Sequence, residues 1–312
     1  MKKVWHNFGR NWLFLLPHVV LMAAVFSEQT VFSQQAKSST KVERDIPYAD
    51  TDNPRQTLDL YLPTKRESER LPVIAFIHGG GWRVGDKGNG RQRTAVAYAG
   101  SGKYAAVSIG YRLTGEACWP AQIHDCKAAI RWIHANAQKY GLDARRIGVT
   151  GNSAGGHLVA MLGTTNGMKG LEGELGPNTQ FRSDVTCVVD FFGPTDLLTM
   201  GTWHDHPDSP ESSLVGGPLQ KTKDVARQAS PITHVSKDDV PFLIIHGTTD
   251  KVVPFDQSVR FHAALKNVYV ETTLITRTGE GHGEPYHNGQ SDALVREFFD
   301  KHLLGADSPV GK

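Results

Sequence analysis

The stretch GVTGNSAGGHLVAML, residues 148–162, joins a short apolar run to a run with helical character. Within it, Ser153 stands between Gly151 and Gly155, which fits the pattern G-x-S-x-G. A strand-to-helix turn of this kind is so sharp that larger flanking residues would clash, and it exposes a serine in a strained backbone conformation. The start of the helix also directs backbone N–H groups toward developing negative charge. Ser153 is therefore the candidate nucleophile, and the alternative is a glycine-rich turn with an incidental serine.

A second glycine-rich stretch, HGGGW at residues 78–82, follows the apolar run PVIAFI. Glycine at such a place lets backbone N–H groups approach a substrate oxygen with no side chain in the way. We expect an oxyanion hole made by the N–H groups of Gly80, Gly81 and Ala154, the last being the residue after the candidate nucleophile. The alternative reading of HGGGW is a simple tight turn.

A serine at this kind of turn requires an acid and then a histidine further along the chain. Asp250 follows the apolar run PFLIIHG, and His282 lies in the glycine-rich stretch GEGHGEP. Asp196 in GPTD and His287 are the competing candidates. In the preferred assignment, His282 takes the proton of Ser153 and returns it to the leaving group. Asp250 fixes the tautomer of His282 and stabilises its imidazolium.

Strand-like apolar runs alternate with helix-like runs along the chain, which predicts one α/β domain over residues 46–305 with a mostly parallel sheet covered by helices. QTLDLYLP, residues 56–63, alternates apolar and polar residues, so we expect an antiparallel strand with one solvated face at the N-terminal edge. Residues 193–240 lie between two predicted strands and are rich in Pro, Ser, Gly and Asp. A structureless loop of that length is improbable, so we expect a partly helical insert over the active site.

The N-terminal segment is predicted to be a signal peptide over residues 1–33, followed by a polar lead over residues 34–45. A basic start precedes the apolar run NWLFLLPHVVLMAAVF, and cleavage could follow Ser33 or Ser27. An uncleaved membrane anchor is the alternative, although the apolar run is short for a span. We expect a secreted or periplasmic protein without stable membrane association after cleavage.

The composition and net charge of the chain indicate which kinds of molecule it is suited to bind. The 312 residues carry a formal charge of +2, with 39% hydrophobic and 21% charged residues. Cleavage after Ser33 would remove three basic residues and one acidic residue and leave the charge balanced, which argues against nucleic acid as the main partner. No feature of the sequence indicates a dimer, so the oligomeric state stays open.

The remaining reactive side chains have structural interpretations. Export permits a disulfide, and Cys126–Cys187 is our guess for a pair, although buried structural cysteines are the preferred reading and Cys118 would stay unpaired. The stretch WHDHPD, residues 203–208, could bind a metal but is expected to be solvated. His157, on the helix behind Ser153, is expected to be a packed or hydrogen-bonded structural residue. No metal and no organic cofactor is predicted.

These motifs resemble the α/β-hydrolase fold and, more narrowly, the hormone-sensitive-lipase-like esterases, whose HGGGW, GxSAGG and YRL elements stand here at His78, Gly151 and Tyr111. The stretches FFGPTDL, SPITHVSKDDVPFLIIHGTTDKVVPFDQS and GEGHGEP are similar to the bifunctional feruloyl and acetyl-xylan esterases. One departure is YRLTGEACWP, where Thr114 and Gly115 replace the Ala-Pro that relatives often carry.

The resemblance implies a carboxylic ester hydrolase that works through an acyl-enzyme on Ser153 and needs no cofactor. It also implies that Trp82 lines the cleft beside the oxyanion hole and that the insert shapes one side of the substrate site. Together, the predicted export and the resemblance to this family imply that the substrate is an acetyl or feruloyl ester on a polysaccharide. The alternatives are a short-chain lipase or general carboxylesterase, a prolyl-oligopeptidase-like peptidase, and a non-catalytic binding homologue.

Overall fold

The computed structural model describes residues 39–88, 91–283 and 289–305 and contains a single eight-stranded sheet within them. The strand order is β1-β2-β4-β3-β5-β6-β7-β8. β1 pairs antiparallel with β2, and β2 pairs antiparallel with β4, whereas all other neighbours are parallel. The strands are β1 Thr40–Pro47, β2 Thr57–Pro63, β3 Leu71–Ile77, β4 Ala105–Ile109, β5 Leu142–Asn152, β6 Cys187–Phe191, β7 Phe242–Gly247 and β8 Thr272–Arg277. The mostly parallel sheet predicted from the sequence is confirmed.

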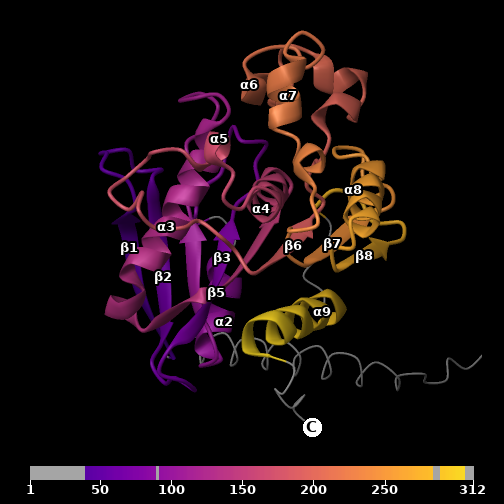
Figure 1. Cartoon of the computed structure of the whole chain (residues 1–312). Helices are drawn as coiled ribbons and strands as arrows, with labels where there is room; N and C mark the ends of the chain where they lie inside the picture. Colours follow the sequence, from indigo (N-terminus) through magenta and orange to yellow (C-terminus); the bar gives the residue numbers. More distant parts are fainter. Residues whose placement is uncertain (1–38, 89–90, 284–288, 306–312) are drawn as a thin grey trace, which may run out of the picture.

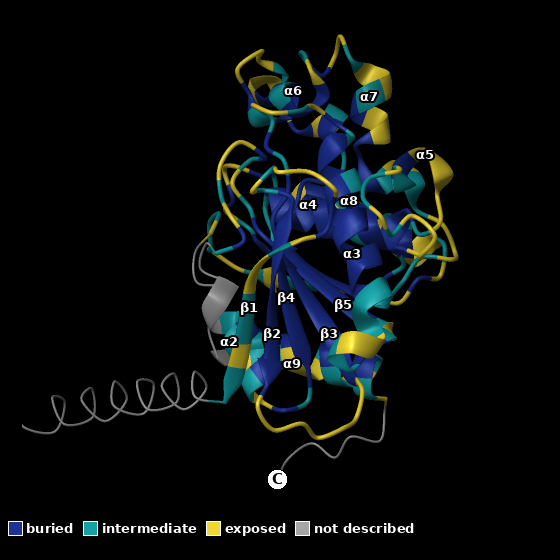
Figure 2. Cartoon of the chain, turned by 90° about the vertical axis from the view of Figure 1, so that its left-hand side faces the viewer, coloured by how far each residue is buried: buried dark blue, intermediate teal, exposed yellow. Residues whose placement is uncertain are grey.

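Helices cover both faces of the sheet (Figure 1). Residues of α3, α4 and α8 share one hydrophobic core with one face, and residues of α2 and α9 share a second core with the other. The longer helices are α2 Arg91–Gly100, α3 Ala121–Tyr140, α4 Ala154–Thr164, α8 Asp256–Asn267 and α9 Gly289–Phe299, which runs into a π-helical turn at Asp300–Leu304. β3, β4, β6 and β7 are buried along their whole length, which is expected of parallel strands with helices on both sides. Figure 2 shows this burial for β3 and β4.

Two expectations for the N-terminal part of the sheet were wrong. Every residue of β2 is buried, and this strand lies between β1 and β4 rather than at the edge. The edge strand is β1, whose first residues fall within the segment predicted to be a polar lead. The polar alternation was misleading because the buried Asp59 of β2 is paired with Arg44 of β1, whose guanidinium lies 3.1 Å from the carboxylate.

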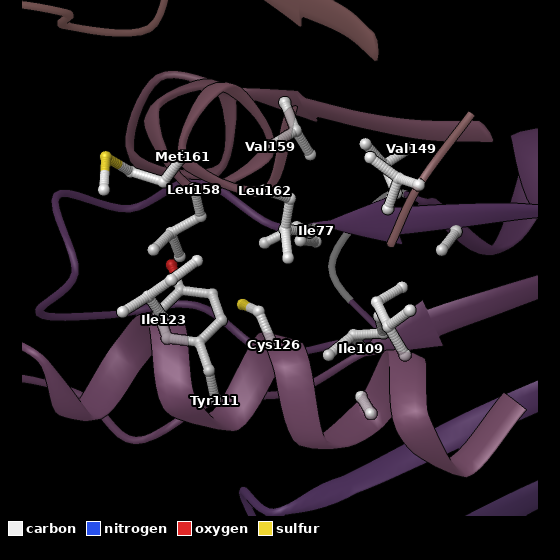
Figure 3. Close-up of a cluster of buried hydrophobic side chains, with 14 of the residues drawn as sticks. Ile77, Ile109, Tyr111, Ile123, Cys126, Val149, Leu158, Val159, Met161 and Leu162 are labelled. Atoms are coloured by element: carbon white, nitrogen blue, oxygen red, sulfur yellow. The ribbon is translucent and has the colours of Figure 1, made fainter. Parts of the chain in front are cut away.

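The guessed disulfide was also wrong. Cys126 belongs to the core under α3 and α4, whereas Cys187 belongs to the core on the opposite face, so the sheet stands between the two sulfur atoms. All three cysteines are free thiols, and Cys118 is exposed. Figure 3 shows Cys126 of α3 beneath Leu158 and Leu162 of α4, where it packs as a small apolar side chain.

The insert between β6 and β7 is built from short helices that stand above the sheet (Figure 1). They are α6 Pro210–Val215 and α7 Lys223–Gln228, with 3₁₀ turns at Leu197–Thr199, Thr202–Asp205 and Pro231–His234. One further short helix, α5 Lys169–Glu172, follows α4. The partly helical insert that the sequence predicted is therefore present at the end of the sheet where β5 passes into α4.

Candidate active site

The turn between β5 and α4 holds Ser153 in a conformation that L-residues rarely adopt, with φ 53° and ψ −122°. The glycines of this turn are required because any side chain there would clash with the neighbouring backbone. A Cβ on Gly151 would come 2.3 Å from the carbonyl oxygen of Gly155, and a Cβ on Gly155 would come 2.2 Å from that of Ile77. The Ser153 N–H donates to the Phe191 carbonyl at 2.9 Å, which fixes the turn to the neighbouring strand. The sharp strand-to-helix turn predicted from the motif is present.

Three of the predicted residues meet at this turn. His282 Nε2 lies 3.0 Å from Ser153 Oγ, and His282 Nδ1 lies 2.7 Å from Asp250 Oδ2. Of the competing candidates, Asp196 is engaged elsewhere, since it pairs with Arg260 at 2.8 Å and caps a 3₁₀ turn. His287 lies outside the described residues. Serine, histidine and carboxylate thus form one hydrogen-bonded chain, drawn from three separate loops.

Asp250 is held by donors on both carboxylate oxygens. Oδ1 accepts the backbone N–H groups of Val252 and Val253 at 2.8 and 2.9 Å, and Oδ2 accepts from His282 and from a second histidine, His246, at 3.1 Å. Burial alone would raise the pKa of Asp250, but the hydrogen bonds from His246 and His282 outweigh it and hold the pKa well below its usual range. The Asp250 carboxylate is therefore ionised in the folded protein at neutral pH.

The sequence reasoning missed His246, whose side chain is fully buried at the end of β7. It also missed Phe192, whose ring centroid lies 4.7 Å from that of His282 and whose φ is 44°. A signal for His246 was available, because a histidine that ends the otherwise apolar run PFLII must find a polar partner when it is buried.

The HGGGW loop adopts a conformation that only glycine accommodates at its centre. Gly80 has φ 110°, and a Cβ there would come 2.2 Å from the Val84 carbonyl oxygen; Gly81 has φ 58°. The Gly80 carbonyl accepts the N–H groups of Arg83 and Val84, both at 3.1 Å. Ala154 is the first residue of α4, so its N–H has no acceptor within the helix.

Trp82 lies elsewhere than predicted. Its side chain is 1% exposed and packs edge-on against His157, with 5.1 Å between the ring centroids, so it belongs to the core and does not line an open cleft. His157 itself has the structural surroundings expected of it. Burial lowers its pKa to about 4, and Nε2 lies 2.6 Å from the Ala229 carbonyl oxygen in the insert. The neutral imidazole thus donates to the insert and ties α4 to it.

The insert also touches the HGGGW loop and the loop before α3. The Arg83 guanidinium donates to the carbonyl oxygens of Asp208 and Ser209 at 2.6 and 3.1 Å. Trp119 donates its backbone N–H to Leu214 O at 2.7 Å and its indole N–H to Gln228 Oε1 at 3.0 Å. The insert is therefore anchored beside the candidate site by polar contacts on two sides.

The WHDHPD stretch differs in part from its expected solvated state. His204 is 6% exposed, and its Nδ1 lies 3.0 Å from the carboxylate of Glu211, which is 5% exposed. His206 and Asp208 are exposed. Across residues 39–88, 91–283 and 289–305, no three His, Cys, Asp or Glu side chains are grouped as metal ligands would be. In the same part of the chain, no helix combines the length and the apolar character needed to cross a bilayer.

The sheet is mostly parallel with helices on both faces, and a strained serine at a strand-to-helix turn contacts a histidine that in turn contacts a carboxylate. These features define the α/β-hydrolase fold. The chain belongs to the BD-FAE family, whose pattern it matches over residues 58–265. It is 33% identical to Esterase LipC of Mycobacterium tuberculosis over 241 residues, which cover 74% of this chain and 58% of LipC. The chain spans only 45% to 64% of the first three curated relatives that it matches.

Two solved structures are more similar still. One is described as a truncated form of a carbohydrate esterase from gut microbiota, with a TM-score of 0.78 and 35% identity over 85% of this chain and 96% of that one. The other is described as a bifunctional GH43-CE protein of Bacteroides eggerthii, with a TM-score of 0.79 and 37% identity over 84% of this chain and 35% of that one.

Proposed function

We propose that this protein is a serine carboxylic ester hydrolase with Ser153 as nucleophile, His282 as general base and acid, and Asp250 as the carboxylate that orients His282. The observation that carries the proposal is the hydrogen-bonded chain from Ser153 Oγ through His282 to Asp250 Oδ2, with steps of 3.0 and 2.7 Å. The BD-FAE membership and the names of the relatives, which are esterases, support the same reaction class.

In the proposed cycle, His282 Nε2 accepts the Ser153 proton as Oγ attacks the ester carbonyl. The charge that develops on the carbonyl oxygen is stabilised by the N–H groups of Gly80, Gly81 and Ala154. The imidazolium then protonates the leaving alcohol, and an acyl group remains on Ser153. His282 next activates a water molecule, which releases the acid and restores the serine. Asp250 stays ionised throughout and stabilises the imidazolium.

We further propose that the enzyme is exported and removes acetyl or feruloyl groups from polysaccharide. The predicted signal peptide over residues 1–33, which lies outside the described residues, supports export. The similarity to proteins described as a carbohydrate esterase and as a GH43-CE enzyme supports a sugar-linked ester. A general carboxylesterase or short-chain lipase would use the same site and differs only in its preferred ester, and a peptidase of the prolyl-oligopeptidase type would cleave an amide instead.

The test measures acid release from acetylated, feruloylated arabinoxylan, with p-nitrophenyl acetate as the control for activity. The reference variant is Ser153→Ala, and the matched control is Ser101→Ala, an exposed serine at the end of α2. We expect release of acetate or ferulate by the wild type and by Ser101→Ala, and none by Ser153→Ala. Turnover of p-nitrophenyl acetate with an untouched polymer would reject the polysaccharide substrate and leave a small-ester hydrolase. Retained activity in Ser153→Ala would reject the triad.

A further inference from the structure

A second histidine contacts the same carboxylate oxygen of Asp250 that His282 contacts. His246 Nε2 lies 3.1 Å from Asp250 Oδ2 and 3.1 Å from the Val253 carbonyl oxygen. Its other ring nitrogen, Nδ1, lies 2.7 Å from Ser258 Oγ of α8. The side chains of His246 and Asp250 are both fully buried. The proposed catalytic cycle has no step for this histidine.

The partners of His246 decide that its Nε2 carries a hydrogen. A carboxylate oxygen and a carbonyl oxygen only accept hydrogen bonds, so the nitrogen between them, Nε2, must carry the hydrogen. The Ser258 hydroxyl can donate or accept, and its contact with Nδ1 holds the ring in this orientation. The ring thereby directs an N–H group at Asp250, with the rings of Phe192 and Phe255 packed around it at centroid distances of 6.1 and 5.6 Å.

The contact also fixes the plane of the carboxylate. Oδ1 of Asp250 is held by two backbone N–H groups, whereas Oδ2 is shared by the two imidazoles. Without His246, the only donor left on Oδ2 among the described residues would be His282 itself. The orientation of the carboxylate would then depend on the group that it is meant to orient.

We propose that His246 is a positioning residue for the triad. Through a buried chain of hydrogen bonds that includes Ser258, it holds Asp250 in the orientation that His282 needs. The inference rests on the proposed function, since it concerns the same carboxylate. It predicts that His246 shares the negative charge of Asp250 with His282. When His246 is lost, the whole charge faces His282, and the Asp250–His282 pair retains its proton to higher pH.

A second carboxyl group near His246, that of Asp190, could also affect the pH profile of activity. Asp190 of β6, the neighbouring strand, interacts electrostatically with His246. Burial raises the pKa of Asp190 to about 6, against the opposing effects of a hydrogen bond from the Gly193 N–H and of His246. An effect of Asp190 on the pH profile must be separated from that of Asp250, and Asp190→Asn does so while it keeps the oxygen that accepts from Gly193.

The experiment compares His246→Leu, which removes the donor, with His246→Gln, whose amide N–H can reach the position of Nε2. The matched control is His262→Leu on α8, a half-buried histidine that contacts Thr272 Oγ1 at 3.1 Å and no triad residue. The readouts are kcat/KM for p-nitrophenyl acetate from pH 4 to 9 and the melting temperature. The pH profile of His246→Leu is also measured in the Asp190→Asn background.

We expect His246→Leu to lower kcat/KM at neutral pH by about 10- to 100-fold, the effect of losing one hydrogen bond to a charged group. We also expect its acidic limb to move to higher pH by roughly half a unit to one unit. His246→Gln should restore most of both, His262→Leu should change neither, and the limb should move equally in the Asp190→Asn background. A uniform loss at all pH values with an unmoved limb, or a glutamine variant no better than leucine, would overturn the inference.

A second measurement covers the case in which His246→Leu does not fold. Proton NMR of the wild type should show two low-field imidazole N–H resonances, from the two histidines that share the Asp250 carboxylate, and His246→Gln should lose one of them. Two resonances that both persist in His246→Gln would overturn the inference. An inactive wild type, or an active Ser153→Ala, would instead reject the proposed function.

Discussion

Replacing Asp250 by asparagine tests the role of this carboxylate in both catalysis and folding. Its two oxygens accept four hydrogen bonds, two from backbone N–H groups and two from His246 and His282. The amide of asparagine offers one acceptor oxygen. If that oxygen faces the backbone donors, the amide NH₂ faces two imidazole N–H groups, and His282 must turn its tautomer so that Nε2 carries hydrogen toward Ser153.

The expected loss of kcat for Asp250→Asn is therefore about 10⁴-fold, the effect of fixing the wrong tautomer in a triad. The assay is steady-state hydrolysis of p-nitrophenyl acetate at pH 7.5, with circular dichroism as the control for folding. A well-folded Asp250→Asn that keeps more than a tenth of the wild-type kcat would refute the assignment of Asp250 as the orienting group.

The same substitution has a pH-dependent effect on stability. The pKa of Asp250 is lower in the folded protein than the value of about 3.9 in an unfolded chain, so the carboxylate stabilises the fold above that pH and this contribution is lost as the pH falls below it. We expect the free energy of unfolding in urea to be about 1.5–3 kcal/mol lower for Asp250→Asn at pH 7. The difference should shrink below about pH 4. A difference that grows on acidification would contradict the stabilising sign.

Three further predictions follow from contacts near the site. Gly155→Ala should lower both melting temperature and activity strongly, because its Cβ would come 2.2 Å from the Ile77 carbonyl oxygen; a fully active, equally stable variant in a melting and esterase assay would contradict this. A thiol reagent should modify only Cys118 in the native protein and all three cysteines after unfolding without reductant, and a single reactive thiol in the unfolded chain would mean a disulfide. Arg83→Ala should raise KM for a polymeric ester several-fold more than for p-nitrophenyl acetate, since Arg83 anchors the insert; equal effects on both would argue against an insert that shapes the substrate site.

The local chemistry of the site was predictable because it depends on steric requirements that single residues reveal. Gly151 and Gly155 are dictated by contacts under 2.5 Å that no side chain could relieve, so the motif alone located the turn. The chain order of serine, acid and histidine then pointed to Asp250 and His282, and in the structure His282 lies between Ser153 and Asp250 and contacts both.

What the sequence did not reveal depends on tertiary pairing. A strand such as β2, with Asp59 in its pattern, looks half-exposed until the pairing with Arg44 of β1 is known. Trp82 looked like a cleft residue, but the turn of the loop directs its ring into the core against His157. The importance of His246 depends on the loop that folds Asp250 back toward it, a contact that no local pattern encodes.

The central claim is that Ser153 is the nucleophile and that His282 activates it. The most direct test is covalent labelling by a p-nitrophenyl alkylphosphonate, followed by mass spectrometry of the proteolysed protein. The account predicts one adduct, on Ser153, with stoichiometric loss of esterase activity, no adduct in Ser153→Ala and strongly slowed labelling in His282→Ala. An adduct on another residue that abolishes activity, or equally fast labelling without His282, would contradict it.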